Sequence, residues 1–269
     1  MNEKLENQGM VEELWRKMLT TGEYGKEVRQ RQFLRFLPGD TRCKICYAPF
    51  QGIGGTISWI IYHKRPSNLN PRLCTTCEAF ARTHRGGAEI ELSLLFVDVR
   101  GSTALAEGMS ATAYGELINR FYTMSTEVLA TSDALIDKII GDQASGIFVP
   151  GFAGSDHARR AIEAGKTILK LTGHNGKTDE PWIPLGAGVH TGKAFVGSLG
   201  GKNGVTDITV LGDVANTAAR LSSVAGIGEI LISESAYRHA RYSTTDQLEQ
   251  RLLELKGKSD KVLVNVFTI

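Results

Sequence analysis

The chain has 269 residues, of which 42% are hydrophobic and 22% charged, and these fractions exclude a disordered or a fibrous protein. Its 31 lysine and arginine residues nearly balance its 29 aspartate and glutamate residues, which argues against binding nucleic acid or a membrane surface through bulk charge. The sequence contains neither an apolar run of about 18 residues nor an N-terminal secretory signal, so we expect a cytoplasmic protein with no membrane partner.

Residues 1–40 are expected to form an N-terminal helical segment. Val11, Leu14 and Met18 recur at helical spacing, and a second helical stretch is expected to follow from 26 to 37. Pro38-Gly39 should end it. The favoured interpretation is a helical hairpin that covers the core.

Residues 41–88 contain all four cysteines of the chain, in two Cys-x-x-Cys pairs formed by Cys43 with Cys46 and Cys74 with Cys77. In a reducing compartment, this pairing indicates a metal site before a disulfide. Structural Zn²⁺ is favoured, while an iron–sulfur cluster and free or redox-exchanging thiols remain open. We predict a small loop-rich module with little helix, acting as a structural staple or as a sensor. Gly86-Gly87 is expected to form a hinge after it.

Residues 89–269 alternate between strand and helix patterns. Strands are expected at 91–99, 135–140, 144–149, 184–189, 194–199, 208–211, 229–232 and 262–267, and helices at 111–131, 155–171 and 213–224. Strand pairs joined by tight turns among helices predict an α+β fold, with a mixed sheet covered by helices on one face.

Two aspartates are placed where strands meet turns. Asp98 lies in an apolar strand just before a glycine turn, and Asp142 lies at a turn between two predicted strands. A buried carboxylate without a partner costs several kcal/mol, so Asp98 should hold a cation or a dense set of hydrogen bonds. Two carboxylates on adjacent strand ends predict an oxygen-lined site for a hard divalent ion. For either residue alone, a turn or helix cap remains the alternative.

Further polar residues follow in the C-terminal half. Asn216 and Arg220 are four residues apart on a predicted helix and share one face. The guanidinium fork of arginine suits phosphoryl oxygens, and asparagine supplies a neutral amide. His190 follows a predicted strand, and a structural role is favoured over that of a catalytic base.

Over residues 90–269, these separated motifs and their order resemble the catalytic domain of class III nucleotidyl cyclases. The resemblance implies a ferredoxin-like fold with a mixed or antiparallel sheet, and it implies that Asp98 and Asp142 bind two Mg²⁺ or Mn²⁺ ions. It assigns roles to five more residues: Lys138 and Thr209 read the purine, Asn216 orients the ribose, Arg220 stabilises the pentavalent phosphorus, and Lys256 binds the triphosphate.

The implied reaction is attack of the ribose 3′-hydroxyl on the α-phosphate, with release of pyrophosphate. The family builds each site across a dimer interface. One subunit supplies the metal ligands, and the other supplies Lys138, Thr209, Asn216 and Arg220. Because this chain carries both sets of residues, a homodimer with two equivalent sites is expected. Lys138 can donate to an adenine ring nitrogen and Thr209 can accept from the exocyclic amine, so the expected substrate is ATP and the product cyclic AMP. A guanylate cyclase and a catalytically weak metal- or redox-sensing adaptor are the alternatives.

A short cluster of basic and aromatic residues suggests a different class of function. Trp59, Tyr62, His63, Lys64 and Arg65 could form the nucleic-acid-binding face of an adaptor protein. A partly buried hairpin edge is the favoured interpretation of this cluster. Together with the near-zero net charge, this leads us to expect no nucleic-acid partner.

Overall fold

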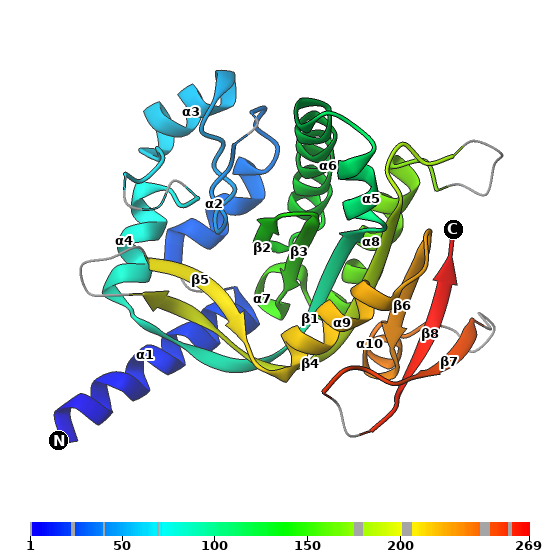
Figure 1. Ribbon diagram of the computed structural model, residues 1–269. Coiled ribbons are helices and arrows are strands. Elements are labelled where there is room, and N and C mark those ends of the chain that lie inside the picture. The colour runs from blue at the N-terminus through cyan, green and yellow to red at the C-terminus, as the bar shows by residue number, and fades with distance from the viewer. Residues whose placement is uncertain are drawn as a thin grey trace. The chain divides into compact units, whose positions relative to one another are not determined.

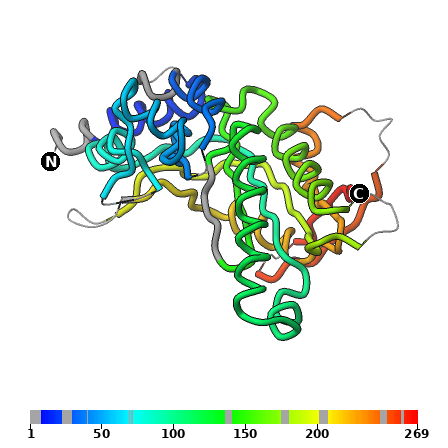
Figure 2. Tube along the Cα trace, turned by 90° about the horizontal axis from the view of Figure 1, so that it is seen from above, coloured from blue at the N-terminus to red at the C-terminus, as the bar shows by residue number. Residues whose placement is uncertain are grey.

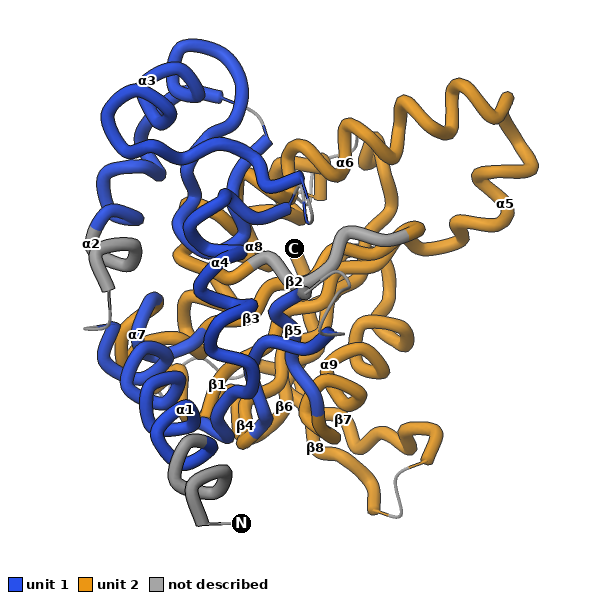
Figure 3. The backbone as a smooth tube through the Cα atoms, turned by 90° about the vertical axis from the view of Figure 1, so that its left-hand side faces the viewer, with its two compact units in different colours: residues 1–90, 149–152, 194–211 blue, residues 91–148, 153–193, 212–269 orange. Residues whose placement is uncertain are grey.

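The computed structural model describes residues 2–22, 25–39, 41–68, 70, 72–174, 180–200, 206–242, 248–257 and 260–269. The chain divides into two compact units (Figure 3). The first unit comprises residues 1–90, 149–152 and 194–211, and the second comprises residues 91–148, 153–193 and 212–269.

The first unit begins with the expected pair of helices, α1 (Asn2–Thr21) and α2 (Gly25–Leu34). Gly22 follows α1 with φ +67°, the left-handed conformation that glycine adopts without strain at a helix end. Trp15 is fully buried, and its indole nitrogen donates to the backbone oxygen of His84 at 2.8 Å. The apolar face of α1 thus packs on the segment that carries the cysteines.

Two helices, α3 (Gly52–Tyr62) and α4 (Thr75–Thr83), occupy the segment for which we expected little helix. The glycines of this segment favoured a loop, but a Cβ atom at Gly54 would collide with the backbone oxygen of Pro38. Glycine therefore serves close packing there. Cys74 is the N-cap of helix α4, and its sulfur accepts from the Cys77 backbone N–H at 3.4 Å. The second Cys-x-x-Cys pair is thus itself the N-terminal cap of a helix.

The hinge predicted at Gly86-Gly87 is wrong, because both residues belong to β1 (Gly86–Val99). A Cβ atom at Gly87 would collide with the backbone oxygen of Val196 in β4 (Leu185–Gly200). The glycines therefore allow two strands to approach closely. Strand β5 (Thr206–Leu211) pairs antiparallel with the C-terminal half of β4.

The two strands predicted at 184–189 and 194–199 form the single strand β4. Gly192, in the gap left between the two predicted strands, lies inside β4, and a Cβ atom there would lie 2.9 Å from the Val214 side chain. Glycine at this position serves the packing of a helix on the strand and does not end the strand.

The strands of the sheet follow one another in the order β2-β3-β1-β4-β6-β8-β7 (Figure 1). Strands β4 and β6 are parallel, while the pairs β1–β3, β2–β3, β6–β8 and β7–β8 are antiparallel, so the predicted α+β fold with a mixed sheet is confirmed. The remaining strands are β2 (Leu135–Ile140), β3 (Gln143–Phe148), β6 (Glu229–Ser233), β7 (Glu249–Leu253) and β8 (Val262–Thr268).

Helices cover both faces of this sheet in the second unit, whereas we expected one. On one face, α6 (Ala111–Thr131) and α8 (His157–Leu171) lie side by side and pack on Leu95, Val189 and Ile230 (Figures 1 and 2). On the other face, α9 (Asp213–Val224) contributes Leu221 to a second core with Val264. Shorter helices are α5 (Ser102–Glu107), α7 (Pro150–Ala153) and α10 (Glu234–His239).

Candidate active site and cysteine cluster

The two predicted aspartates lie side by side at one end of the β1–β3 pair. Asp98 is opposite Gln143 in the antiparallel register, and the backbone N–H of Val99 donates to the backbone oxygen of Asp142 at 3.0 Å. Gly141 has φ +66°, which allows the tight turn that places Asp142 directly before β3. The strand register therefore brings both carboxylates to the same place, as the sequence predicted.

A third charged residue, Arg100, lies between this pair and helix α9. Its Nη2 is 2.6 Å from Oδ2 of Asp98, and its Nη1 donates to the backbone oxygen of Ser223 at 2.5 Å. Burial raises the pKa of the Asp98 carboxyl; the Arg100 guanidinium opposes this rise, and the charge of Asp142 adds to it. The sequence analysis did not single out Arg100, although it lies only two residues after Asp98, in the turn that follows β1.

Two tyrosines of α6 face the turn that carries Asp142. The hydroxyl of Tyr122 donates to the backbone oxygen of Gly141 at 2.6 Å. Burial raises the pKa values of Tyr114 and Tyr122, and the charge of Asp142 raises both further. Tyr122 therefore supports the turn, and both tyrosines keep their protons. Their separation of eight residues places them on one helix face, which was the available sequence signal.

Helix α9 presents Asn216 and Arg220 one turn apart, as predicted, with Asn216 exposed and Arg220 half-buried. A side chain built on Gly257 would lie 3.1 Å from Nη2 of Arg220, so the guanidinium lies against the loop that also carries exposed Lys256. Arg220 and the loop that carries Lys256 are therefore in contact, and both side chains are cations of the kind that suits an anionic ligand. In the part of the chain that the structure describes, no hydrogen bond or ion pair joins Asp98 or Asp142 to Asn216 or Arg220.

The two residues expected to read the purine lie in different units. Lys138 is in β2, opposite Ser145 and next to an irregularity in the strand register, but its side chain lies outside the described residues. Thr209 lies in β5 of the first unit, opposite Gly197, and is half-buried.

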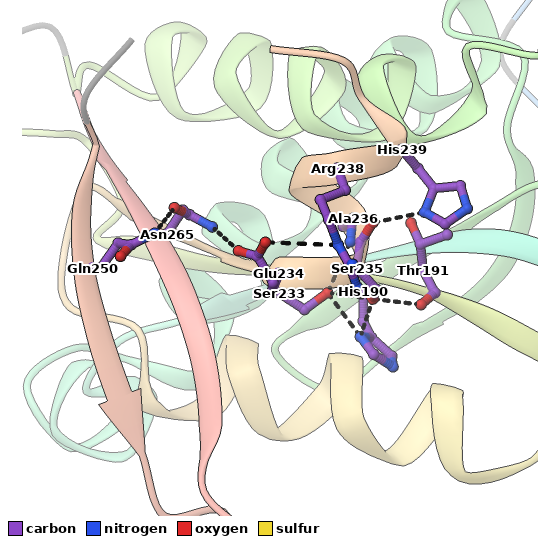
Figure 4. Close-up of polar contacts among 10 residues, drawn as sticks. All are labelled: His190, Thr191, Ser233, Glu234, Ser235, Ala236, Arg238, His239, Gln250 and Asn265. Carbon is purple, nitrogen blue, oxygen red and sulfur yellow. Dashed lines mark hydrogen bonds and ion pairs between the residues drawn. The ribbon is translucent and has the colours of Figure 1, made fainter. Parts of the chain in front are cut away.

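His190 takes part in a polar network at the junction of β4, β6 and α10 (Figure 4). Its Nδ1 lies 2.8 Å from the Ser233 hydroxyl, and the Ser235 hydroxyl donates to the Thr191 backbone oxygen at 2.7 Å. Ser233 also caps α10 by accepting from the Ala236 N–H. These contacts support the structural interpretation of His190.

The four cysteine sulfurs form one buried cluster in the first unit. All four lie within 4.8 Å of one another, and the Sγ atoms of Cys46 and Cys74 are 3.7 Å apart. The backbone N–H of Cys74 donates to the sulfur of Cys43 at 3.3 Å. Arg31 of α2 donates to the Ile45 backbone oxygen at 2.6 Å and so supports the first Cys-x-x-Cys turn from outside. These sulfurs could together hold a metal ion.

The contacts within the cluster favour a thiolate at Cys74, while hydrogen bonds with the other cysteines raise the pKa values of the Cys46 and Cys77 thiols. The pKa of the Cys74 thiol lies well below its ordinary value because its sulfur accepts hydrogen bonds from the other three cysteines, and the Lys64 ammonium lowers it further. Lys64 is only 2% exposed. Lys64 is therefore not part of an exposed surface. The partly buried hairpin edge expected for this segment is wrong, because Trp59 and Tyr62 belong to helix α3.

The family model for the adenylate and guanylate cyclase catalytic domain matches residues 88–267, which is more than half of the chain. The chain belongs to this family. The resemblance inferred from the sequence motifs is therefore confirmed, and the class III cyclase fold with it.

Among curated relatives, the cyclase chain is 29% identical over 185 residues to an adenylate cyclase of Anabaena cylindrica, a match that covers 64% of this chain and 36% of the relative. It is also 29% identical over 175 residues to guanylate cyclase 32E of Drosophila melanogaster, covering 63% of this chain and 15% of that protein. The chain thus spans between 15% and 36% of the length of these two relatives.

Solved structures give the same picture of the cyclase domain. The adenylyl cyclase CyaB from P. aeruginosa matches with a TM-score of 0.58 and 28% identity over 68% of this chain and 96% of that chain. The guanylyl cyclase Cya2 matches with a TM-score of 0.59 and 25% identity over 67% and 93%. Cyclases named for either nucleotide are thus similar to this chain.

The described part of the cyclase contains no helix that combines the length and apolar character needed to cross a lipid bilayer.

Proposed function

We propose that this cyclase is an adenylate cyclase that converts ATP to 3′,5′-cyclic AMP and pyrophosphate. The observation that carries the proposal is the side-by-side placement of Asp98 and Asp142 at the end of β1 and β3, in a chain of the cyclase family. Paired carboxylates at a strand end suit divalent ions that position a triphosphate.

The carboxylate pair fits a divalent cation on electrostatic grounds. Asp142 is close enough to raise the pKa of Asp98, and no ion pair among the described residues neutralises Asp142. Two Mg²⁺ or Mn²⁺ ions bound there would lower the pKa of the ribose 3′-hydroxyl and neutralise the triphosphate. Neither carboxylate needs to act as a nucleophile.

The remaining roles belong to side chains that hold the nucleotide. Arg220 stabilises the charge that develops at the α-phosphorus, because a fixed guanidinium fork binds phosphoryl oxygens in two places. Asn216, one turn earlier on α9, orients the ribose. Lys256, beside Arg220, binds the triphosphate, and the close approach of Arg220 to Gly257 supports this assignment.

We propose that two copies of the chain form a homodimer with two equivalent sites. One protomer supplies Asp98 and Asp142 to each site, and its partner supplies Asn216 and Arg220. The lack of a direct contact between these two sets in the described part of a single chain supports this arrangement. Each chain carries both sets, so the dimer closes on itself with two-fold symmetry.

We assign ATP as the substrate on the chemistry of Lys138 and Thr209. A lysine donates to an adenine ring nitrogen, whereas guanine presents a carbonyl and a ring N–H that favour an acidic partner. GTP is the second candidate, because the threonine hydroxyl can also donate and because guanylate cyclases are among the relatives.

A turnover assay with Mn²⁺ and either ATP or GTP tests the proposal, with Asp98→Ala as the control. Cyclic AMP formed by the wild-type protein and lost in the variant supports it. A preference for GTP would transfer the assignment to guanylate cyclase. The absence of both cyclic products would leave the catalytically weak adaptor as the function.

We propose that residues 41–88 form a metal-binding module in front of the catalytic domain at 89–269, and that the ion is Zn²⁺. A tetrahedral zinc with bonds of about 2.3 Å places its sulfurs about 3.8 Å apart, close to the 3.7 Å between Cys46 and Cys74. An iron–sulfur cluster distributes its cysteines over several iron atoms and would separate them further. Metal analysis of the purified protein tests this assignment, and charge-transfer absorbance would contradict it.

A further inference from the structure

We propose that Lys44 is a positioning residue that couples the cysteine cluster to the strand carrying Thr209, and so helps set the choice of nucleotide base. This inference rests on the proposed function of Thr209. All the residues that carry it belong to the first unit.

Lys44 lies between Cys43 and Cys46 in the sequence, and its side chain extends away from the sulfurs to strand β5. Its side chain is only 4% exposed, and its Nζ donates to the Ile208 backbone oxygen at 2.5 Å. The same nitrogen lies 3.3 Å from Oδ1 of Asp207. A buried ammonium must be paired, because an unpaired charge there would cost several kcal/mol. Lys44 therefore fixes two consecutive residues of β5.

A second hydrogen bond joins the module to the same β-hairpin. The hydroxyl of Ser198 in β4 donates to the backbone oxygen of Ala81 in α4 at 2.6 Å. Ser198 is directly opposite Ile208 in the β4–β5 register, and Cys74 caps the start of α4. Each Cys-x-x-Cys pair thus has its own connection to the hairpin, one through Lys44 and one through α4.

Both hydrogen bonds hold the sheet at Ile208, the residue before Thr209: Lys44 contacts Ile208 itself, and Ser198 is its partner on β4. The backbone oxygen of Ile208 and the N–H of Thr209 belong to one planar peptide, so the bond from Lys44 orients the peptide that leads into Thr209. Ile208 and Val210 are buried, whereas Asp207 and Thr209 alternate with them on the more open face. Lys44 therefore holds β5 through the Ile208 carbonyl and through the side chain of Asp207, which lies on the same face of the strand as Thr209, two residues before it.

Loss of the metal ion from the cysteine cluster should affect recognition of the nucleotide base more than it affects binding of the phosphates. Without metal, the turn from Cys43 to Cys46 loses the bonds that fix Lys44, so β5 loosens at Ile208. Asp98, Asp142 and Arg220 belong to the second unit and are not among these contacts. We therefore expect a change in the ratio of ATP to GTP use that exceeds any change in kcat for ATP.

The decisive variant is Lys44→Met, which keeps the aliphatic stem and removes the ammonium, with Lys193→Met on the exposed part of β4 as the matched control. We expect the variant to keep its metal and its kcat for ATP within about three-fold. Its ratio of kcat/KM for ATP over GTP should fall by about ten-fold, on the scale of one charged hydrogen bond. An unchanged ratio at full metal content would overturn the proposal.

Ser198→Ala gives a milder test that does not disturb the cysteine turns, and a smaller shift of the ratio of kcat/KM for ATP over GTP in the same direction is expected.

Amide hydrogen exchange needs no catalysis and separates this inference from the proposed function. Exchange at residues 207–211 should accelerate about ten-fold in Lys44→Met and in metal-stripped wild-type protein. If the wild-type protein makes no cyclic nucleotide, the proposed function fails, and unchanged exchange at these amides independently overturns the coupling.

Discussion

The acidic pair of the second unit and the cysteine cluster of the first suit two different relations between a protein and a metal ion. The four cysteines are at most 1% exposed, and their sulfurs lie within 4.8 Å of one another. The side chain of Asp98 is 16% exposed and already has a cationic partner in Arg100. The fully buried cysteine ligands suit a permanently bound structural ion. The partly exposed aspartate pair suits ions that bind together with a nucleotide.

The comparison predicts that removing ligands has opposite effects on stability at the two sites. At the cysteine cluster the ion is part of the folded core, so its ligands stabilise the protein. At the acidic pair, burial raises the pKa of Asp98, so ionising this carboxyl costs free energy in the folded state. The three predictions that follow run from the largest expected change in stability to the smallest.

The largest change is expected for the double variant Cys43→Ser/Cys46→Ser. It should lose its bound metal and lower the melting temperature by about 10 °C or more, because metal binding contributes directly to folding. Metal analysis and thermal denaturation measure this. Ala48→Ser adds one hydroxyl to the same buried turn and should keep the metal. A double variant with wild-type stability would contradict the structural role, and full cyclase activity with an unchanged dimer would exclude a sensor.

A smaller effect of opposite sign is expected for Asp98→Asn. In metal-free protein the melting temperature should rise by about 2–4 °C, because the amide removes a buried charge at neutral pH. Cyclase turnover should fall by about 10³-fold. Asp156→Asn, at an exposed position, should change neither quantity. A destabilised Asp98→Asn protein would show that the carboxylate is needed for folding and not only for cation binding.

The smallest effect concerns two buried histidines of the second unit. Burial lowers the pKa values of His157 and His174, and Nε2 of His174 accepts from the Leu185 N–H at 3.3 Å, which requires an unprotonated nitrogen. Their stabilisation is complete above the unfolded pKa of about 6.5 and is lost as pH falls through the lower folded values.

Thermal denaturation from pH 7.5 to 5.5 should therefore show a falling melting temperature. The His157→Gln variant should flatten this dependence, and His63→Asn, at an exposed left-handed position, should leave it unchanged. Equal slopes for wild-type protein and His157→Gln would contradict the assignment.

The placement of several candidate site residues of the catalytic domain could be predicted from the sequence, because it depends on the local periodicity of strands and helices. Asp98 at a strand end and Asn216 with Arg220 on one helix follow from spacings of two and four residues. Arg100 and Tyr122 were missed because their contacts with Ser223 and Gly141 are set by tertiary packing. A hydrogen bond from Arg100 to Ser223 spans 123 residues, and no local pattern records it.

Glycine misled the sequence reasoning in a consistent way. Gly54 lies in the segment expected to be loop-rich, Gly87 in the expected hinge, and Gly192 between two predicted strands. Each in fact lies inside a helix or strand where another backbone or side chain approaches closely. Glycine permits unusual backbone angles, and it also permits another chain segment to pack directly against its backbone. The sequence alone does not distinguish these two uses. The helix capped by Cys74 was missed for a related reason, since a metal-ligand motif concealed a capping residue.

The central claim is that each site takes its carboxylates from one protomer and its arginine from the other. Asp98→Ala and Arg220→Ala should each be inactive alone. An equal mixture should regain about a quarter of wild-type activity, because half of the dimers are mixed and each mixed dimer has one intact site of two. A mixture that stays inactive while mixed dimers form would contradict the shared site.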